Sequence, residues 1–424
     1  MTLPSEIVLP SSSSTVSVKA FNTVDDTCQA PAALFLEPVL AGRESMASFP
    51  VYSFLIEHGS GRRIMFDLGP RKDVEAYPPK LKERFLSIPG FNIRADKDIV
   101  EQLEKGGISL ESVDTVIWSH THFDHTGDLS KWPTSTKLVV GPGSDRRGYP
   151  SVPDAELLDS DFAGREVKEL SFADSKLQIG GRPAIDFFED GSLYLVDMPG
   201  HCPGHIVALA RVKPDSFVLL GGDTFHHVGQ IRPNEHIHKA YPCPGHILDA
   251  TRKSISAEHF ASPGTKEFDL SKRDTPLLSI PPPPSAYNDK DRSLESQKAL
   301  GVLDVHKDIF VMAAHDVTLV GVKSYGSPFG TTVKIPKSAL MITSGKPKEH
   351  VSDTGFHREF CGTCGSGILE YEKEAATEWR YVKYGTLEER GQEVLMLKGE
   401  FFVKYRNKWM PEIPDVFHKE ELEQ

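Results

Sequence analysis

The sequence has few cysteines, no long apolar run and no excess of basic residues. Its five cysteines are an odd and sparse set in 424 residues, which excludes the disulfide framework of a small secreted domain. No stretch approaches the roughly 18 consecutive apolar residues of a membrane-spanning helix. The first residues also lack the basic and apolar regions of a secretory signal. We therefore expect a cytoplasmic protein that does not enter a membrane.

The charge balance is acidic. The chain contains 48 Lys and Arg residues against 60 Asp and Glu residues, a formal net charge of −12. Because an acidic surface repels phosphate backbones, we expect a small-molecule substrate as the partner and no nucleic acid. The hydrophobic and charged fractions, 39% and 25%, are typical of a soluble globular protein, and the length favours two domains.

Short apolar runs separated by turn signals predict a β-rich region. The predicted strands span residues 16–21, 34–40, 51–58, 62–69, 115–120, 136–141, 192–201, 206–212, 215–223 and 308–316. Helical spacing predicts helices over 97–105 and 293–303, the first of them ended by two glycines. Several strands end on a histidine or an aspartate, so we expect the strand ends to meet at one rim, where functional loops usually lie.

The composition divides the chain into parts. We expect a flexible Ser/Pro-rich arm over residues 1–15, a first domain over 16–320 and a second, smaller domain over 321–424. Within the first domain, residues 251–290 are polar and include four consecutive prolines, 281–284. This composition predicts a long loop or insertion, in part polyproline-like.

The strongest local signal is the run Ser-His-Thr-His-Phe-Asp-His at residues 119–125. His120 and His122 are two residues apart after an apolar strand, so a turning backbone can direct both side chains at one point. Asp124 and His125 then face a neighbouring point. Imidazole and carboxylate groups suit Zn²⁺, with iron and manganese as alternatives. A chance polar turn explains three histidines and an aspartate at one strand end poorly.

Three further candidates follow later predicted strands: His201, Asp223 and His315. Taken singly, each has an ordinary explanation, as a turn histidine, a helix N-cap and a hydrogen-bonded core histidine. Together with the earlier run they supply enough ligands for two metals.

This ordered set resembles the metallo-β-lactamase superfamily over about residues 16–320. Residues 120–125 match its H-x-H-x-D-H motif, residues 199–205 match its second histidine motif, and Asp223 and His315 match its bridging aspartate and last histidine. The resemblance implies an α/β fold, the αββα sandwich, with two zinc ions at one edge of the sheets. It implies that the first ion is held by His120, His122 and His201, that the second is held by Asp124, His125 and His315, and that Asp223 bridges them.

Asp67, in the run Phe-Asp-Leu-Gly, resembles the family's strand-end Asp-x-Gly. The resemblance implies that this carboxylate orients the histidine loop from behind the ligands. An ordinary turn aspartate before glycine is the alternative.

The expected chemistry follows from charge. Two cations lower the pKa of a bridging water toward neutrality and polarise a substrate carbonyl. We therefore expect a dinuclear zinc hydrolase that opens a lactone, lactam or related small cyclic ester or amide by metal-bound hydroxide, with Asp124 also moving a proton. A thioesterase acting on an acyl-carrier or glutathione thioester is the alternative enzyme. A non-catalytic binding or scaffold protein is the alternative of another class.

The order of the motifs looks most like the acyl-homoserine-lactone lactonase branch. That branch commonly carries a tyrosine shortly after the bridging aspartate, where it helps to hold the carbonyl oxygen. Here Asp223 is followed by Thr224, Phe225, His226 and His227. The comparison implies that His226 or His227 takes this role, and packing or a surface position is the alternative.

The C-terminal segment carries Cys361-Gly-Thr-Cys364, which is half of a zinc knuckle by spacing. With residues 325–330 and 342–347 it resembles the glutathione-dependent formaldehyde-activating (GFA, CENP-V) family over about 321–415. The upstream cysteines of that family are absent. We interpret Cys361 and Cys364 as a vestigial zinc knuckle or a turn with two free thiols. The β-rich segment would then be a structural appendage or a piece that forms a homodimer.

Overall fold

The computed structural model describes residues 9–25, 27–39, 44–47, 49–236, 274–306, 308–315, 332–340, 347–351, 356–360, 367–372, 378–383, 399–400 and 417–418. The chain forms two compact units. The first comprises residues 1–248 and 257–317, and the second comprises residues 249–256 and 318–424.

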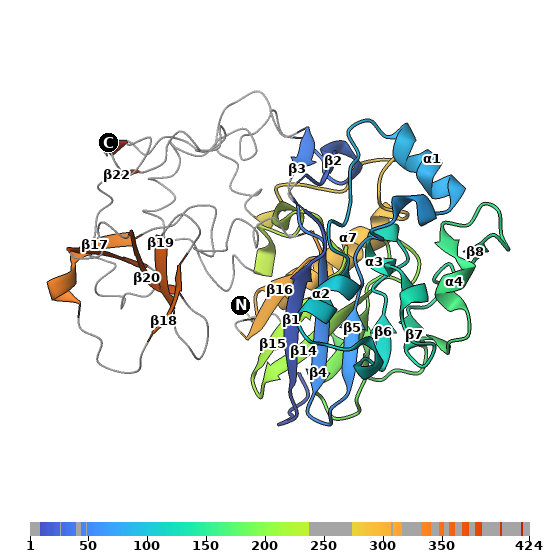
Figure 1. Cartoon of the computed structure of the whole chain (residues 1–424), viewed down its shortest axis with the longest axis horizontal. Coiled ribbons are helices and arrows are strands. Elements are labelled where there is room, and N and C mark those ends of the chain that lie inside the picture. Colours follow the sequence, from blue (N-terminus) through green and yellow to red (C-terminus); the bar gives the residue numbers. More distant parts are fainter. Residues whose placement is uncertain are drawn as a thin grey trace. The chain divides into compact units, whose positions relative to one another are not determined.

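Two six-stranded sheets form the first unit (Figure 1). The first sheet has the order β1 (Val16–Asn22), β4 (Tyr52–His58), β5 (Arg63–Phe66), β6 (Thr115–Ile117), β7 (Lys137–Val140) and β10 (Val167–Glu169). The second has the order β11 (Gln178–Ile179), β12 (Arg182–Asp186), β13 (Leu193–Asp197), β14 (Ile206–Lys213), β15 (Ser216–Leu220) and β16 (Ile309–Met312). Both sheets are mixed, with parallel pairs at β5–β6, β6–β7, β7–β10 and β15–β16.

Alternation along the strands explains why the sheets form layers. Phe54 and Ile56 of β4 and Leu193 and Leu195 of β13 share one buried cluster, which therefore lies between the sheets. The intervening Leu55 packs instead with α2 (Ile99–Lys105). Successive side chains of a strand point to opposite faces, so a strand covered on both faces is apolar throughout.

The outer face of the second sheet is covered in the same way. Tyr194 and Val196 pack with Leu300 and Leu303 of α7 (Lys290–Asp304). The order of layers is therefore α2, first sheet, second sheet and α7, which is the αββα sandwich that the sequence predicted.

Shorter elements complete the first unit. They are α1 (Pro79–Ser87), α3 (Phe123–Thr126), α4 (Asp159–Phe162), the paired strands β2 (Gln29–Pro31) and β3 (Ser45–Ala47), and the paired strands β8 (Gly148–Tyr149) and β9 (Leu157–Leu158). The 3-10 turns lie at Ala32–Leu34, Val74–Ala76, Leu110–Ser112, Leu129–Lys131 and Val228–Gln230.

The predicted strand over residues 34–40 is wrong. Residues 32–34 form a 3-10 turn, and the backbone N–H of Leu36 donates to the carbonyl of Ala32. Residue 40 lies outside the described residues. Pro38 has no N–H to donate, so this apolar run cannot complete a strand ladder.

Part of the predicted arm and of the predicted insertion is described. Pro10 and Ser12 are tied to the sandwich, because Arg211 donates to the carbonyl of Pro10 and Ser12 Oγ donates to the carbonyl of Asp190, 2.5 Å away. Residues 274–289 of the insertion contribute buried side chains, among them Ile280 and Tyr287. These apolar anchors were not expected from the polar composition of the segment.

The second unit contains a five-stranded antiparallel sheet among its described residues. Its order is β17 (Thr332–Pro336), β21 (Trp379–Lys383), β20 (Gly367–Glu372), β19 (Phe356–Phe360) and β18 (Lys348–Val351). Two further short strands, β22 (Gly399–Glu400) and β23 (Phe417–His418), pair with each other. This unit is the β-rich C-terminal region that the sequence predicted. Cys361 and Cys364 lie outside the described residues.

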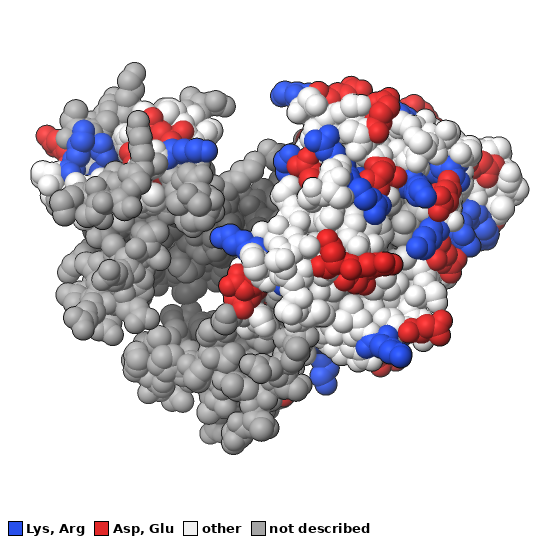
Figure 2. Space-filling model, turned by 90° about the horizontal axis from the view of Figure 1, so that it is seen from below, with Lys and Arg blue, Asp and Glu red and all other residues white. Residues whose placement is uncertain are grey.

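Charged side chains of both signs are interspersed over the face of the first unit seen in Figure 2. Within the part of the chain that the structure describes, no helix is both long enough and apolar enough to cross a membrane.

Candidate metal centre

The histidine run begins in the tightly packed loop after β6 and ends within α3. The backbone N–H of Ser119 donates to Asp67 Oδ1 over 2.6 Å, and α3 is followed by Gly127, whose φ is +58°. A Cβ at Gly127 would lie 2.4 Å from the Cβ of Leu68. Glycine is therefore required both by the backbone conformation and by the close approach of the neighbouring chain.

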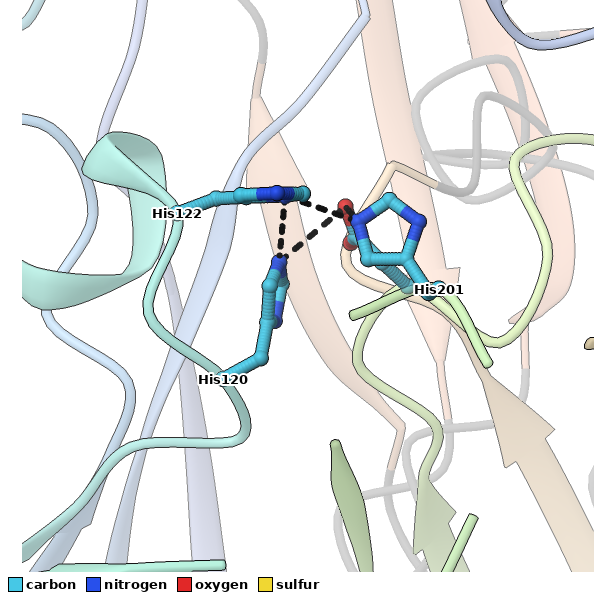
Figure 3. A group of neighbouring side chains, drawn as sticks. His120, His122 and His201 are labelled. Carbon is cyan, nitrogen blue, oxygen red and sulfur yellow. Dashed lines mark hydrogen bonds and ion pairs between the residues drawn. The ribbon is translucent and has the colours of Figure 1, made fainter. Parts of the chain in front are cut away.

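His120, His122 and His201 form the first cluster (Figure 3). His122 Nδ1 lies 3.0 Å from His120 Nε2 and 2.8 Å from His201 Nε2. His201 comes from the loop that follows β13, and the other two come from the loop that follows β6. Two strand ends of different sheets thus bring three ring nitrogens to one point.

Asp124, His125 and His315 form the second cluster. His315 follows β16, and its Nε2 lies 3.4 Å from Asp124 Oδ2. Asp223, which follows β15, stands between the two clusters. Its Oδ1 lies 3.2 Å from Nε2 of both His125 and His315, whereas its Oδ2 lies 3.2 Å from His201 Nε2.

Three of these rings are also held by contacts at Nδ1, the nitrogen that faces away from the centre. His315 Nδ1 donates to the carbonyl of Pro50 over 3.0 Å, and His125 Nδ1 lies 2.9 Å from Asp67 Oδ2. His120 Nδ1 lies 2.9 Å from Ser119 Oγ. A proton on each outer nitrogen leaves a lone pair on the inner nitrogen, which is the state a metal ligand needs. Asp67 thus contacts both the loop backbone and a candidate ligand.

The clustered atoms fit divalent cations. His125 Nε2 and Asp223 Oδ1 are 3.2 Å apart, yet neither forms a hydrogen bond within the described chain. Burial and the charge of neighbouring histidines, His125 for His120 and His201 for His122, lower the pKa of both rings well below its ordinary value. Although burial opposes ionisation of Asp223, His315 and His125 outweigh it and lower the pKa of this carboxyl. Burial opposes protonation of His125 and His315, but the charge of Asp223 outweighs it and raises the pKa of both rings. Neutral His120 and His122 beside the ionised Asp223 are donors suited to a metal.

His205 is a positioning residue that the sequence argument did not assign. It is fully buried, its Nδ1 donates to the carbonyl of Met198 over 2.9 Å, and its Nε2 accepts from the backbone N–H of Asp223 over 2.9 Å. Burial lowers its pKa to about 3, so the ring stays neutral and keeps this acceptor. His205 is the last residue of the second histidine motif, at residues 199–205, and this position was the feature of the sequence that could have predicted its role.

The two histidines after Asp223 have different surroundings. His226 is 1% exposed, and its Nε2 lies 3.1 Å from Asp223 Oδ2. His227 Nδ1 instead accepts from the backbone N–H of Gly229 over 2.9 Å, which caps a 3-10 turn. The geometry therefore places His226, and not His227, beside the candidate centre.

Cys202 is buried next to His201, and burial raises the pKa of its thiol to about 12. It belongs to none of the candidate metal groups found among the described residues. A thiol held protonated is a poor metal ligand.

Residues 47–302 match the family model described as the metallo-beta-lactamase superfamily, and residues 322–405 match the one described as glutathione-dependent formaldehyde-activating enzyme. Because the first match spans more than half of the chain, the protein belongs to the metallo-beta-lactamase superfamily. It carries in addition a C-terminal GFA domain.

Relatives match about three quarters of the chain. The chain is 36% identical to gamma-lactamase FDB1 of Fusarium pseudograminearum over 75% of its own length and 78% of the relative's. It is 37% identical to metallo-hydrolase mfmC of Annulohypoxylon moriforme over 74% of its own length and 82% of the relative's. It is 39% identical to cytochrome P450 monooxygenase mpaDE of Penicillium roqueforti over 76% of its own length, but it spans only 36% of that protein.

These comparisons support a metal-dependent hydrolase related to gamma-lactamases. They agree with the donor set, in which imidazoles and carboxylates converge at the rim of the sandwich.

Proposed function

We propose that this chain is a dinuclear zinc hydrolase that opens a lactone, lactam or related small cyclic ester or amide. The observation that carries the proposal is the position of Asp223. Its Oδ1 lies 3.2 Å from Nε2 of both His125 and His315 in the second cluster, and its Oδ2 lies 3.2 Å from His201 Nε2 in the first. A carboxylate between two clusters is suited to bridging two cations.

His120, His122 and His201 would hold one ion, Asp124, His125 and His315 would hold the other, and Asp223 would contact both. Bound divalent cations would supply Lewis acidity, which activates water at neutral pH and polarises a carbonyl. Zinc suits this mixture of nitrogen and oxygen donors, and iron or manganese are the alternatives.

The residues of the chain have distinct tasks in this proposal. Asp124 is 6% exposed and lies at the candidate centre, where its carboxylate would also carry a proton to the leaving group. His226, beside Asp223, would hold the carbonyl oxygen of the substrate. Asp67 and His205 position ligands without touching substrate.

The relative named gamma-lactamase favours a cyclic amide as the first substrate class to test. A cyclic ester is the second, because the same attack on a ring carbonyl opens both. A thioester belongs in the panel as the competing class.

The test pairs elemental analysis with a panel of substrates. The panel contains an acyl-homoserine lactone, an aromatic γ-lactone, a benzoxazolinone-type cyclic compound, a cephalosporin and an acyl thioester. We expect about two zinc equivalents per chain and turnover of a lactam or lactone. Turnover of the thioester alone would overturn the ring-opening assignment.

A variant with Cys361→Ser and Cys364→Ser separates the two domains in the metal analysis. We expect it to keep both zinc equivalents and full ring-opening activity, because the proposed centre lies wholly in the first unit. Loss of zinc together with activity in this variant would show that the chemistry needs the C-terminal cysteines.

A further inference from the structure

Tyr287 contacts the candidate centre from a distant part of the sequence. Its hydroxyl lies 2.7 Å from His226 Nδ1, although 61 residues separate the two. Its ring also packs edge-on against His201, with centroids 5.1 Å apart. Both the tyrosine and His226 are buried, at 5% and 1% exposure.

The direction of the hydrogen bonds follows from the groups around His226. Asp223 Oδ2, 3.1 Å from Nε2, belongs to an ionised carboxylate that can only accept. A neutral imidazole carries one proton, so Nε2–H toward Asp223 leaves Nδ1 as an acceptor. The Tyr287 hydroxyl then donates to Nδ1.

Gln230 is a second possible acceptor for the Tyr287 hydroxyl. Its Oε1 accepts from the backbone N–H of His226 over 2.8 Å and lies 3.3 Å from the Tyr287 hydroxyl. If Tyr287 donated to Gln230 and accepted from Nδ1, a bare Nε2 would face the carboxylate. The shorter contact, 2.7 Å against 3.3 Å, favours donation to His226.

The position of Tyr287 is fixed by its neighbours. The backbone N–H of Asn288 donates to the carbonyl of His201 over 2.9 Å, and that of Asp289 donates to the carbonyl of Gly200 over 3.0 Å. Gln297 of α7 donates to the carbonyl of Thr224 over 2.9 Å. This segment therefore binds the loops that carry both His201 and Asp223.

We propose that Tyr287 is a positioning residue that donates to Nδ1 of His226 and so fixes the tautomer in which Nε2 carries the proton. That tautomer presents an N–H donor at the Asp223 edge of the centre, where it can hold the carbonyl oxygen of the substrate. The inference rests on the proposed ring-opening function. It assigns the task of the tyrosine expected shortly after Asp223 to two residues, His226 and Tyr287.

The direct test is nitrogen-15 NMR of zinc-loaded protein labelled at histidine, since zinc is diamagnetic. We expect His226 to show a protonated Nε2 and an unprotonated Nδ1, with its signals identified by their loss in His226→Gln. Tyr287→Phe should mix or reverse this pattern. A protonated Nδ1 in the unmodified protein, with Nε2 bare or bound to zinc, would overturn the proposal and make His226 a further ligand.

Kinetics give the second readout. Tyr287→Phe should lower kcat about tenfold with little change in KM or zinc content, whereas His226→Gln should lower kcat on the order of a hundredfold. The double variant should be no slower than His226→Gln, because Tyr287 acts through that histidine. If the losses of kcat in the two single variants multiplied in the double variant, Tyr287 would not act through His226.

Tyr194→Phe is the matched control. Tyr194 is a fully buried tyrosine of β13 that packs in the core under α7, and its substitution should leave kcat and the histidine signals unchanged. Absence of zinc and turnover in the unmodified protein would reject the proposed function. Normal zinc and turnover with an unaltered Tyr287→Phe variant would reject only this inference.

Discussion

The two ends of the sandwich hold the same kinds of side chain in different states. At one end, His58 closes β4, where its Nδ1 accepts from the backbone N–H of Ser60 and its Nε2 lies 2.8 Å from Asp190 Oδ2. At the other end, β4 begins at Tyr52, whose N–H donates to the carbonyl of Ala314 beside His315. The ends are six residues apart along β4, which is roughly 20 Å.

The difference lies in how the polar atoms are satisfied. Both nitrogens of His58 have partners, and the ring stacks on Phe188. At the opposite end, His122 Nδ1 faces two other ring nitrogens at 2.8 and 3.0 Å, and His125 Nε2 faces Asp223 without a hydrogen bond among the described residues. Acceptors that converge on one another, and not the number of histidines, mark the end suited to a cation.

Substitutions at the two ends should differ most in their effect on the rate of ring opening. His122→Ala removes one ring from the first cluster, so we expect kcat/KM for ring opening to fall on the order of 10³-fold or more. His58→Ala at the other end should keep its rate within about twofold, because the contact of His58 with Asp190 lies at the end of β4 away from the candidate centre. Steady-state kinetics on both variants, with circular dichroism for folding, provide the measurement. Equal losses would contradict the assignment of the centre.

Asp67→Asn should have a smaller effect. Asparagine tolerates the positive φ of 61° at this position, but its amide cannot accept from both Ser119 N–H and His125 Nδ1–H. We expect zinc affinity to fall about 10- to 100-fold with the fold intact. Competition with a zinc chelator measures this, and an affinity equal to that of the unmodified protein would make Asp67 an ordinary turn residue.

The smallest expected effect is on stability, at a hydrogen bond between α7 and the loop that carries His201. Ser296 Oγ donates to the carbonyl of Pro199 over 2.7 Å in a buried position. Ser296→Ala leaves this carbonyl without that donor, which should cost about 1 kcal/mol of unfolding free energy. Chemical denaturation checks the value, and Ser130→Ala, at an exposed serine, should change stability by no more than about 0.5 kcal/mol.

The sequence predicted the parts of the site whose residues are close together along the chain. His120, His122, Asp124 and His125 lie within six residues, in the loop after β6 and in α3, so their convergence follows from local backbone geometry. Consecutive apolar residues such as Phe54, Leu55 and Ile56 predicted a strand, and the structure shows that it is buried on both faces.

The partners of these residues could not be predicted in the same way. Tyr287 reaches His226 only because the segment before α7 folds back over two loops, and no local pattern encodes that contact. His205 holds the backbone of Asp223 across 18 residues. Residues 34–40 showed a second limit, since an apolar run containing Pro38 has the composition of a strand without its hydrogen-bonding capacity.

We propose that the seven clustered side chains bind two metal ions. Elemental analysis of the dialysed 424-residue chain, compared with its His122→Ala variant, tests this proposal. We expect about two equivalents of divalent metal per chain, with at least one lost in the variant. Metal near zero in the unmodified chain, or equal metal in both proteins, would contradict a dinuclear centre at these residues.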